Sequence, residues 1–183
     1  MTGRQRGMAA FKAVVYTLLA VNILVFFLAS DALVPHKAVD QVGWCILLAV
    51  FEWETRIPGG GVHPARFGRW PLVFEAGGYA CALYALGHYL AEPDWLEVTN
   101  ASAWLAISAL IWMDILRPDG GRALLRGWLR TGLYALTFIC AVIWGVEGKL
   151  LDFYDAALWI LCFFVIELNI LGLEHPGLRP RPR

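Results

Sequence analysis

Five carboxylates lie within or beside long apolar stretches of this sequence. They are Glu52, Glu54, Glu75, Asp114 and Glu167. An acidic side chain in an apolar environment costs a few kcal/mol unless it is paired, hydrated or protonated. Acids in such surroundings line cation pathways and proton relays. The five residues are therefore candidates for a transport or relay site.

Basic residues at helical spacing are expected to neutralise some of these acids. Glu52 and Arg56 lie four positions apart, and Asp114 and Arg117 lie three apart, so each pair would share a helix face. Glu167 has no basic residue within four positions, which makes it the strongest relay candidate. The alternative is a structural charge lattice, in which paired acids hold neighbouring helices together.

Six apolar stretches carry these residues. They cover residues 11–30, 40–57, 72–91, 100–117, 131–146 and 155–171. Each approaches the roughly 17–25 residues that a membrane-spanning helix needs, and the 183-residue chain is 59% hydrophobic. The sequence therefore predicts an all-α integral membrane protein, with six transmembrane helices in a single domain that covers residues 1–183.

The distribution of basic residues predicts the orientation of these helices. Only Lys37 and Lys149 lie in loops on one side, so 13 of the 15 basic residues lie on the other. Because basic loops stay in the cytoplasm, both termini are expected there, with the protein in a plasma or inner membrane. An even number of spans gives the same result.

One group of arginines predicts a lipid contact. Arg122, Arg126 and Arg130 are spaced by four, with leucines and a tryptophan between them. This pattern is typical of a short interfacial helix that faces anionic lipids of the cytoplasmic leaflet. The arginines of the chain are spread over four segments, including a basic tail at 174–183, which argues against nucleic acid as a partner. Self-assembly and a larger membrane complex both stay open.

A weak repeat links the second, fourth and sixth stretches. They align without gaps, with matching pairs at Asp40 and Trp44, Asn100 and Trp104, and Asp155 and Trp159. The alignment predicts three two-helix hairpins, at about 11–57, 72–117 and 129–171, with approximate threefold pseudo-symmetry around the membrane normal. The three tryptophans are expected in an aromatic belt at the outer interface.

Cofactor and enzyme signatures do not occur in the sequence. It has no nucleophile–base pair and no metal-ligand spacing, and His88 is taken as the only histidine within a predicted helix. The cysteines, which are expected to be unpaired, are Cys45, Cys81, Cys140 and Cys162. Two functions are compatible with these features. One is a channel or transporter that passes protons, cations or a small solute along inner-side carboxylates, and the other is a non-catalytic subunit of a membrane complex.

Overall fold

Six α-helices, with no strand among them, form the part of the chain that the structure describes. A computed structural model describes residues 3–29, 35–56, 69–92, 94–116 and 122–170. The helices are α1 (Gly3–Ala29), α2 (Pro35–Arg56), α3 (Trp70–Ala91), α4 (Trp95–Leu116), α5 (Ala123–Val146) and α6 (Leu150–Ile170). The predicted all-helical fold with six helices is confirmed.

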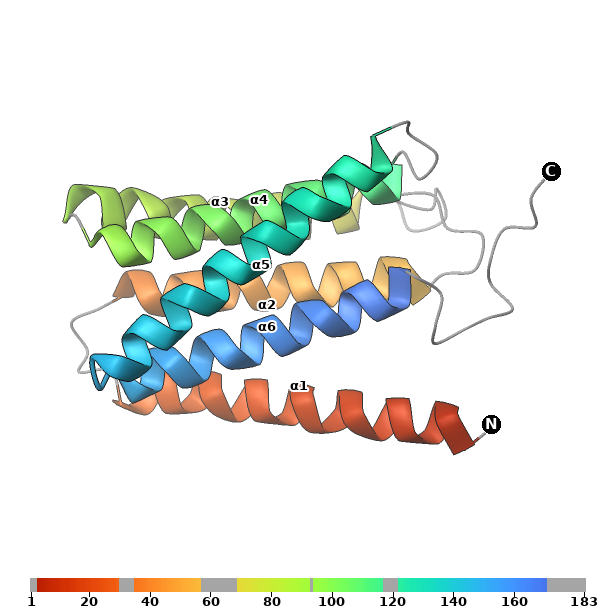
Figure 1. Ribbon diagram of the computed structural model, residues 1–183, viewed down its shortest axis with the longest axis horizontal. Coiled ribbons are helices and arrows are strands. Elements are labelled where there is room, and N and C mark those ends of the chain that lie inside the picture. Colours follow the sequence, from red (N-terminus) through yellow and green to blue (C-terminus); the bar gives the residue numbers. More distant parts are fainter. Residues whose placement is uncertain (1–2, 30–34, 57–68, 93, 117–121, 171–183) are drawn as a thin grey trace.

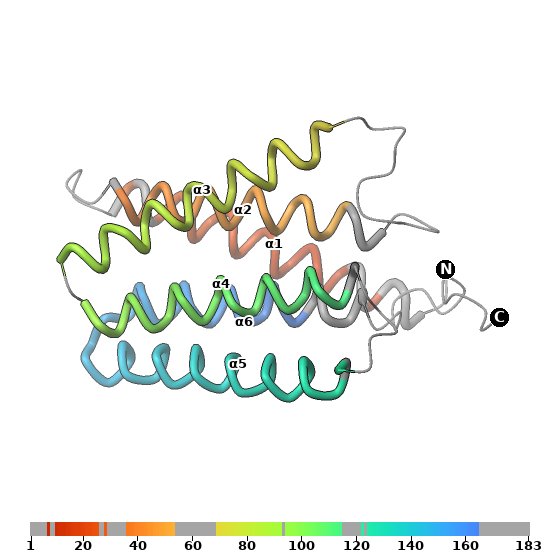
Figure 2. The backbone as a smooth tube through the Cα atoms, turned by 90° about the horizontal axis from the view of Figure 1, so that it is seen from above, coloured from red at the N-terminus to blue at the C-terminus, as the bar shows by residue number. Residues whose placement is uncertain are grey.

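The helices run in alternating directions and so define two ends of the bundle (Figure 1). At the hairpin end, α1 leads into α2, α3 into α4, and α5 into α6. At the terminal end lie the start of α1 and the ends of α2, α4 and α6. Each odd-numbered helix contacts two even-numbered ones: α1 contacts α6 and α2, α3 contacts α2 and α4, and α5 contacts α4 and α6. The contacts therefore form a closed series around the bundle; Figure 2 shows the same helices turned by 90° about the horizontal axis.

The core lies where α2, α4 and α6 face one another. Leu47, Phe51, Ile107, Ile111 and Phe163 from these helices have no solvent exposure. Burial of such large apolar side chains stabilises each helix against its neighbours by about 1.5–3 kcal/mol per residue in water. The interior is therefore a packed apolar column over much of its length.

Two glycines bring α2 and α3 into close contact. A Cβ atom added at Gly43 would lie 2.6 Å from Cβ of Cys81, and one added at Gly78 would lie 2.7 Å from Cγ of Leu47. Small residues allow helix backbones to approach closely, and a larger side chain at either position would separate them. This contact fixes α3 against the hairpin-end half of α2.

The even-numbered helices begin five residues before their predicted starts, at Pro35, Trp95 and Leu150. For α4 the cause is a capping residue: the backbone N–H groups of Leu96 and Glu97 donate to Oδ1 of Asp94, at 3.1 and 3.3 Å. The predicted starts at Asp40, Asn100 and Asp155 thus lie more than one turn inside their helices.

The arginine-rich segment before the fifth apolar stretch also differs from its prediction. It is the first part of a continuous helix α5 rather than a separate interfacial helix. At the other end of α5, Gly148 has a positive φ of 79°. This backbone conformation, which favours glycine, lets the chain turn directly into α6.

Among the residues that the structure describes, two helical segments are long and apolar enough to cross a membrane by length and composition. They are Trp95–Asp114 in α4 and Leu124–Val146 in α5. They indicate an association with the membrane.

Candidate functional site

The predicted relay acids belong to helix segments at the terminal end, and two of them, Glu52 and Asp114, pair with basic side chains of neighbouring helices. Nζ of Lys12 in α1 lies 2.9 Å from Oε1 of Glu52 in α2, and only 3% of Lys12 is exposed. Asp114 in α4 forms ion pairs with both Arg126 and Arg130 of α5. The partners of these two acids therefore come from other helices.

This arrangement changes the expected role of two arginines. Arg126 and Arg130 were predicted to face lipid, but their side chains are only 12% and 14% exposed beside Asp114. Burial costs each guanidinium part of its hydration free energy, and the nearby carboxylate of Asp114 offsets part of this cost. Arg122, at the start of α5, is exposed, in keeping with a position at the surface.

The other predicted residues at this end are less completely described. Glu75 in α3 is 8% exposed and so belongs to the interior. Glu54, Arg56 and Glu167 lie on α2 and α6, but their side chains fall outside those that the structure describes, as does all of Arg117. The proposed Glu52–Arg56 and Asp114–Arg117 pairs, and the role of Glu167, therefore stay predictions.

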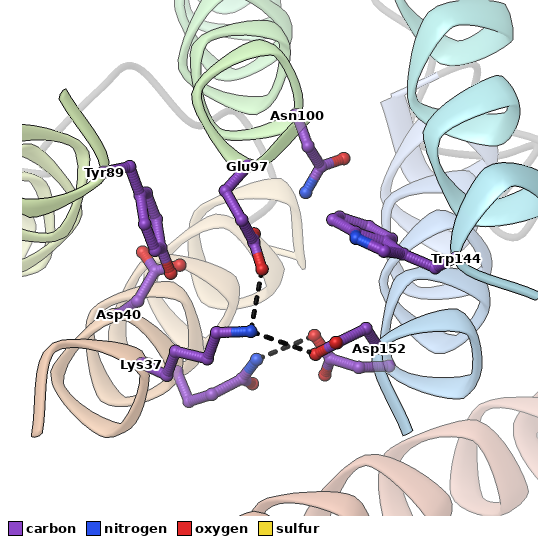
Figure 3. Close-up of a pocket in the computed structure, with 9 residues that line it drawn as sticks. Lys37, Asp40, Tyr89, Glu97, Asn100, Trp144 and Asp152 are labelled. Atoms are coloured by element: carbon purple, nitrogen blue, oxygen red, sulfur yellow. Dashed lines mark hydrogen bonds and ion pairs between the residues drawn. The ribbon is translucent and has the colours of Figure 1, made fainter. Parts of the chain in front are cut away.

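A second polar cluster, at the hairpin end, was not predicted as a site. Its outermost members are Lys37 in α2, Glu97 in α4 and Asp152 in α6 (Figure 3). Nζ of Lys37 lies 2.7 Å from Oε1 of Glu97 and 3.2 Å from Oδ1 of Asp152. Burial lowers the pKa of Lys37, but the two carboxylates outweigh that effect and raise the pKa above its usual value. Lys37 is therefore an ammonium ion that connects three helices.

One turn deeper, a layer of carboxyl and amide groups comes from α2, α4 and α6 and, through Asn22, from α1. Asp155 accepts hydrogen bonds from Nδ2 of Asn22, at 2.5 Å, and from Nε2 of Gln41, at 2.8 Å. Asp40 and Asn100 line the same space. Oδ1 of Asp40 and Oδ1 of Asn100 are buried without a hydrogen-bond partner among the described residues. This layer thus holds two acceptors that are ready for a donor.

Below this layer, three tryptophans form an apolar floor. The ring centroid of Trp44 lies 6.3 Å from that of Trp104 and 6.5 Å from that of Trp159. Each of the three residues is 5% exposed. Phe163 packs against Trp104 at 4.8 Å. The predicted aromatic belt is wrong for these tryptophans, because their helices turn the rings toward the bundle interior. Nε1 of Trp159 reaches the polar layer and donates to Oε1 of Gln41 at 3.1 Å, and the side chain of Trp44 forms a hydrogen bond with Asp40.

A polar cavity of about 40 Å³, here the upper cavity, lies between the layer of Lys37 and the layer of Asp155. A second cavity of about 30 Å³ lies against the tryptophan floor. Both are lined by Asp40, Asn100 and Asp155. Trp144 of α5 forms one wall of the upper cavity and is 3% exposed, and its Nε1 is buried without a described partner. A water needs about 10–15 Å³ of such space, so the upper cavity has room for a few waters or one small ion.

A pair of histidines lies at the same end, between α2 and α3. The rings of His36 and His88 stack with centroids 4.8 Å apart, and Tyr89 meets the edge of His36 at 5.4 Å. His88 is therefore not the only helical histidine, because α2 begins early enough to include His36. Burial, the nearby His88 and Lys37 lower the pKa of His36, against a weaker opposite effect of Glu92.

Metal and thiol chemistry find little support in the described part of the chain. No group of three or more histidine, cysteine, aspartate or glutamate side chains there is arranged to hold a metal ion. The four cysteines form no disulfide. The polar groups that line the hairpin-end cavity are carboxyl and amide groups together with Lys37, Tyr89 and Trp144.

The cluster was missed although the repeat contains a signal for it. Lys37, Glu97 and Asp152 each lie three residues before a repeat anchor, at Asp40, Asn100 and Asp155. Because the anchors were taken as helix starts, the preceding charges were assigned to loops. A helix extended by one turn puts residues three apart on the same face, which would have predicted two polar layers one above the other.

Comparison of the chain with protein-family models, with curated proteins and with solved structures found no match.

Proposed function

We propose that this chain is a six-span membrane protein that binds a small monovalent cation in the polar cavity at the hairpin end and passes it across the membrane. The observation that carries the proposal is the cavity itself. Four carboxyl groups and one lysine line it, and buried acceptors of two lining residues have no donor among the described residues. Buried polar groups without partners are rare except where a ligand or water completes them.

The outer surface of the bundle supports the membrane assignment. Large apolar side chains are exposed on every helix; examples are Leu24, Val42, Leu83, Met113, Phe138 and Phe164. A water-soluble protein rarely exposes apolar surface on this scale. Each helix also has at least 21 residues, which is enough to cross a hydrocarbon core of about 30 Å at ~1.5 Å per residue.

Matching repeat positions support a bundle of three related hairpins. Residues 37, 97 and 152 meet in ion pairs, residues 40, 100 and 155 line the same cavities, and residues 44, 104 and 159 pack together. Three helices that bring equivalent positions together in successive layers are arranged around a common axis. With both termini in the cytoplasm, as the basic residues indicate, the cavity would face the outer side.

The layers also suggest the direction of access. Side chains at the mouth are partly exposed, with 27% for Lys37 and 21% for Asp152. Below the tryptophan floor, Leu47, Phe51 and Ile107 have no exposure. The cavity is thus accessible from the hairpin end and closed toward the terminal end. Passage would require this apolar column to open, as in transporters that alternate between two accessible states.

The paired acids of the terminal end fit a supporting role in this proposal. Glu52 and Asp114 are held by Lys12 and by two arginines, so they join neighbouring helices rather than receive a passing ion. Glu167, which the sequence singles out, is retained as the candidate for the exit side.

Flux through liposomes containing the purified chain tests the proposal. Ammonium-driven pH change inside the vesicles is recorded for wild type, Asp40→Asn and Glu147→Gln. Glu147 is the matched control, because it lies at the same end on the exposed surface, beside Lys149. We expect Asp40→Asn to reduce the transport rate about tenfold, because a tenfold change corresponds to the free energy of roughly one charge-assisted hydrogen bond. We expect the control to have the same rate as wild type.

Two results would overturn this function. One is flux no greater than in empty vesicles for ammonium, potassium, sodium and protons alike. The other is an equal rate in wild type and Asp40→Asn.

A second candidate function is that of a non-catalytic membrane subunit. It is favoured by an open apolar groove of about 530 Å³ between α2 and α3, toward the terminal end. The groove is lined by Ile46, Ala49, Val50, Trp53, Trp70, Pro71 and Phe74. A subunit of this kind would give no flux and would co-purify with a stable partner through this groove.

A further inference from the structure

We propose that the Lys37 ammonium is a built-in occupant of the cation site, and that the diffusible ligand with which it competes is ammonium or a small primary amine. This inference rests on the proposed function, because it assumes that the hairpin-end cavity binds a cation. It goes further in naming the chemical class of the ligand and the residue that regulates its entry.

The position of Lys37 within the layers is the first reason. At the corresponding positions, α4 carries Glu97 and α6 carries Asp152. Among the described residues that line the cavity, this lysine is the only basic side chain, and it completes the layer. Its Nζ lies between the two carboxylates at 2.7 and 3.2 Å, the hydrogen-bonding geometry that a free ammonium ion would adopt. The protein therefore already recognises a primary ammonium at the mouth of the cavity.

The layer beneath Lys37 provides the second reason. Oδ1 of Asp40 and Oδ1 of Asn100 are acceptors without a described donor, whereas an ammonium ion has N–H donors in several directions. An amide and a carboxylate from different helices suit a singly charged donor. In the described residues, the acids are not grouped as ligands for a metal ion.

The size and walls of the cavity narrow the ligand class. About 40 Å³, with an adjoining 30 Å³, admits ammonium or methylammonium but no large organic cation. The floor consists of Trp44, Trp104 and Trp159. Aromatic rings attract weakly hydrated cations such as ammonium ions, whereas a strongly hydrated magnesium ion keeps its water shell.

Lys37 is also able to leave. Its side chain is 27% exposed, and it lies in the first turn of α2, close to the hairpin-end surface. Four rotatable methylene groups allow the ammonium to move to water while the helix stays in place. Its departure would leave Glu97 and Asp152 free to attract an incoming cation toward Asp40.

The test is ammonium binding to the purified full-length chain in detergent, at constant ionic strength with sodium as the replaced ion. Thermal stability and tryptophan fluorescence are followed for wild type, Lys37→Met and Lys149→Met. Lys149 is the matched control, since it pairs with Glu147 at the same end but is exposed. We expect Lys37→Met to bind ammonium about tenfold more tightly than wild type. We expect Lys149→Met to match wild type, methylammonium to compete, and magnesium to have no effect.

If Lys37→Met does not fold, the double variant Lys37→Met/Glu97→Gln carries the same test. It removes one partner carboxylate together with the ammonium and keeps Asp40 and Asn100. Unchanged ammonium affinity in the folded variant, or an equal response to magnesium and ammonium, would overturn the inference.

The two proposals fail in different ways. If wild type passes ammonium and depends on Asp40 but Lys37→Met binds no more tightly, the function stands and Lys37 is a structural ion bridge. If Lys37→Met binds ammonium more tightly but no variant gives flux, the built-in cation stands and transport is wrong.

Discussion

Carboxyl groups at the two ends of the bundle have different surroundings. At the terminal end, Glu52 has Lys12 and Asp114 has two arginines. At the hairpin end, Lys37 forms ion pairs with both Glu97 and Asp152. Asp155 accepts hydrogen bonds from the neutral side-chain amides of Asn22 and Gln41. Among the described side chains, Glu52 and Asp114 each have at least one basic partner, whereas the four carboxyl groups that line the hairpin-end cavity outnumber its one lysine.

Under the proposed function, this difference separates a structural role at the terminal end from a binding role at the hairpin end. Paired buried charges cross-link helices, and removing one partner is costly. Unbalanced acids around a cavity are unfavourable for the empty protein and persist where a ligand compensates for them. A neutral substitution should therefore lower stability at the terminal end and raise it at the hairpin end.

Asp114→Asn should have the largest effect. It leaves Arg126 and Arg130 close together without their carboxylate, and we expect a loss of about 3 kcal/mol in the free energy of unfolding. Thermal unfolding in detergent measures the loss. Glu147→Gln, which disrupts an exposed pair with Lys149, should change stability by less than about 0.5 kcal/mol. Equal shifts in the two variants would remove the distinction between the ends.

The Lys12–Glu52 pair should show energetic coupling of about 1–3 kcal/mol. Lys12→Met and Glu52→Gln should each destabilise the protein, because each leaves a mostly buried charge without this partner. The double variant should recover part of the loss. A double-mutant cycle from thermal or denaturant unfolding gives the coupling. Additive losses would show that the contact contributes nothing, and would favour the predicted Arg56 partner instead.

Asp40→Asn should act in the opposite direction, raising stability by less than about 1 kcal/mol. It removes one carboxyl charge from an acid-rich cavity and keeps the size of the side chain, as in functional sites where stability is given up for binding. The same variant should bind ammonium about tenfold more weakly than wild type. A loss of stability comparable with that of Asp114→Asn would mean that Asp40 has a structural role.

The sequence predicted features that depend on local apolar content. Six runs of apolar residues gave six helices. Arg126 and Arg130, which the sequence assigned to lipid, instead pair with Asp114. The rotation of each helix was not predictable in this way. Trp44, Trp104 and Trp159 have the right depth for an interfacial belt, but only the packing of three helices turns them inward.

Long-range pairing explains the other differences. Lys37 lies 60 residues from Glu97 and 115 from Asp152, so no local window relates them. For the same reason the sequence assigned Arg56 to Glu52 by helical spacing, while the structure places Lys12 of α1 beside it. The early start of α2, in contrast, lies at Pro35, a residue that is favoured in the first turn of a helix and does not belong to the apolar pattern.

The smallest expected effect concerns pH at the hairpin end. His36, which faces His88, Tyr89, Lys37 and Glu92, has a lowered pKa because of burial, with His88 and Lys37 as further causes. The unfolded chain then takes up a proton more readily than the folded chain. The stability contributed by neutral His36 is therefore complete above about pH 6.5 and is lost as the pH falls below that value.

His36→Phe isolates this contribution, because it keeps an aromatic ring beside His88 and removes the titration. We expect the fall in melting temperature between pH 7.5 and 5.5, a window of about one unit on each side of the free histidine pKa, to be smaller in the variant than in wild type. The terminal-end pairs are unchanged in both proteins, so the difference reports on the hairpin end alone. Parallel pH profiles would place the histidine pair in water-like surroundings and would limit the contrast between the two ends to their carboxyl groups.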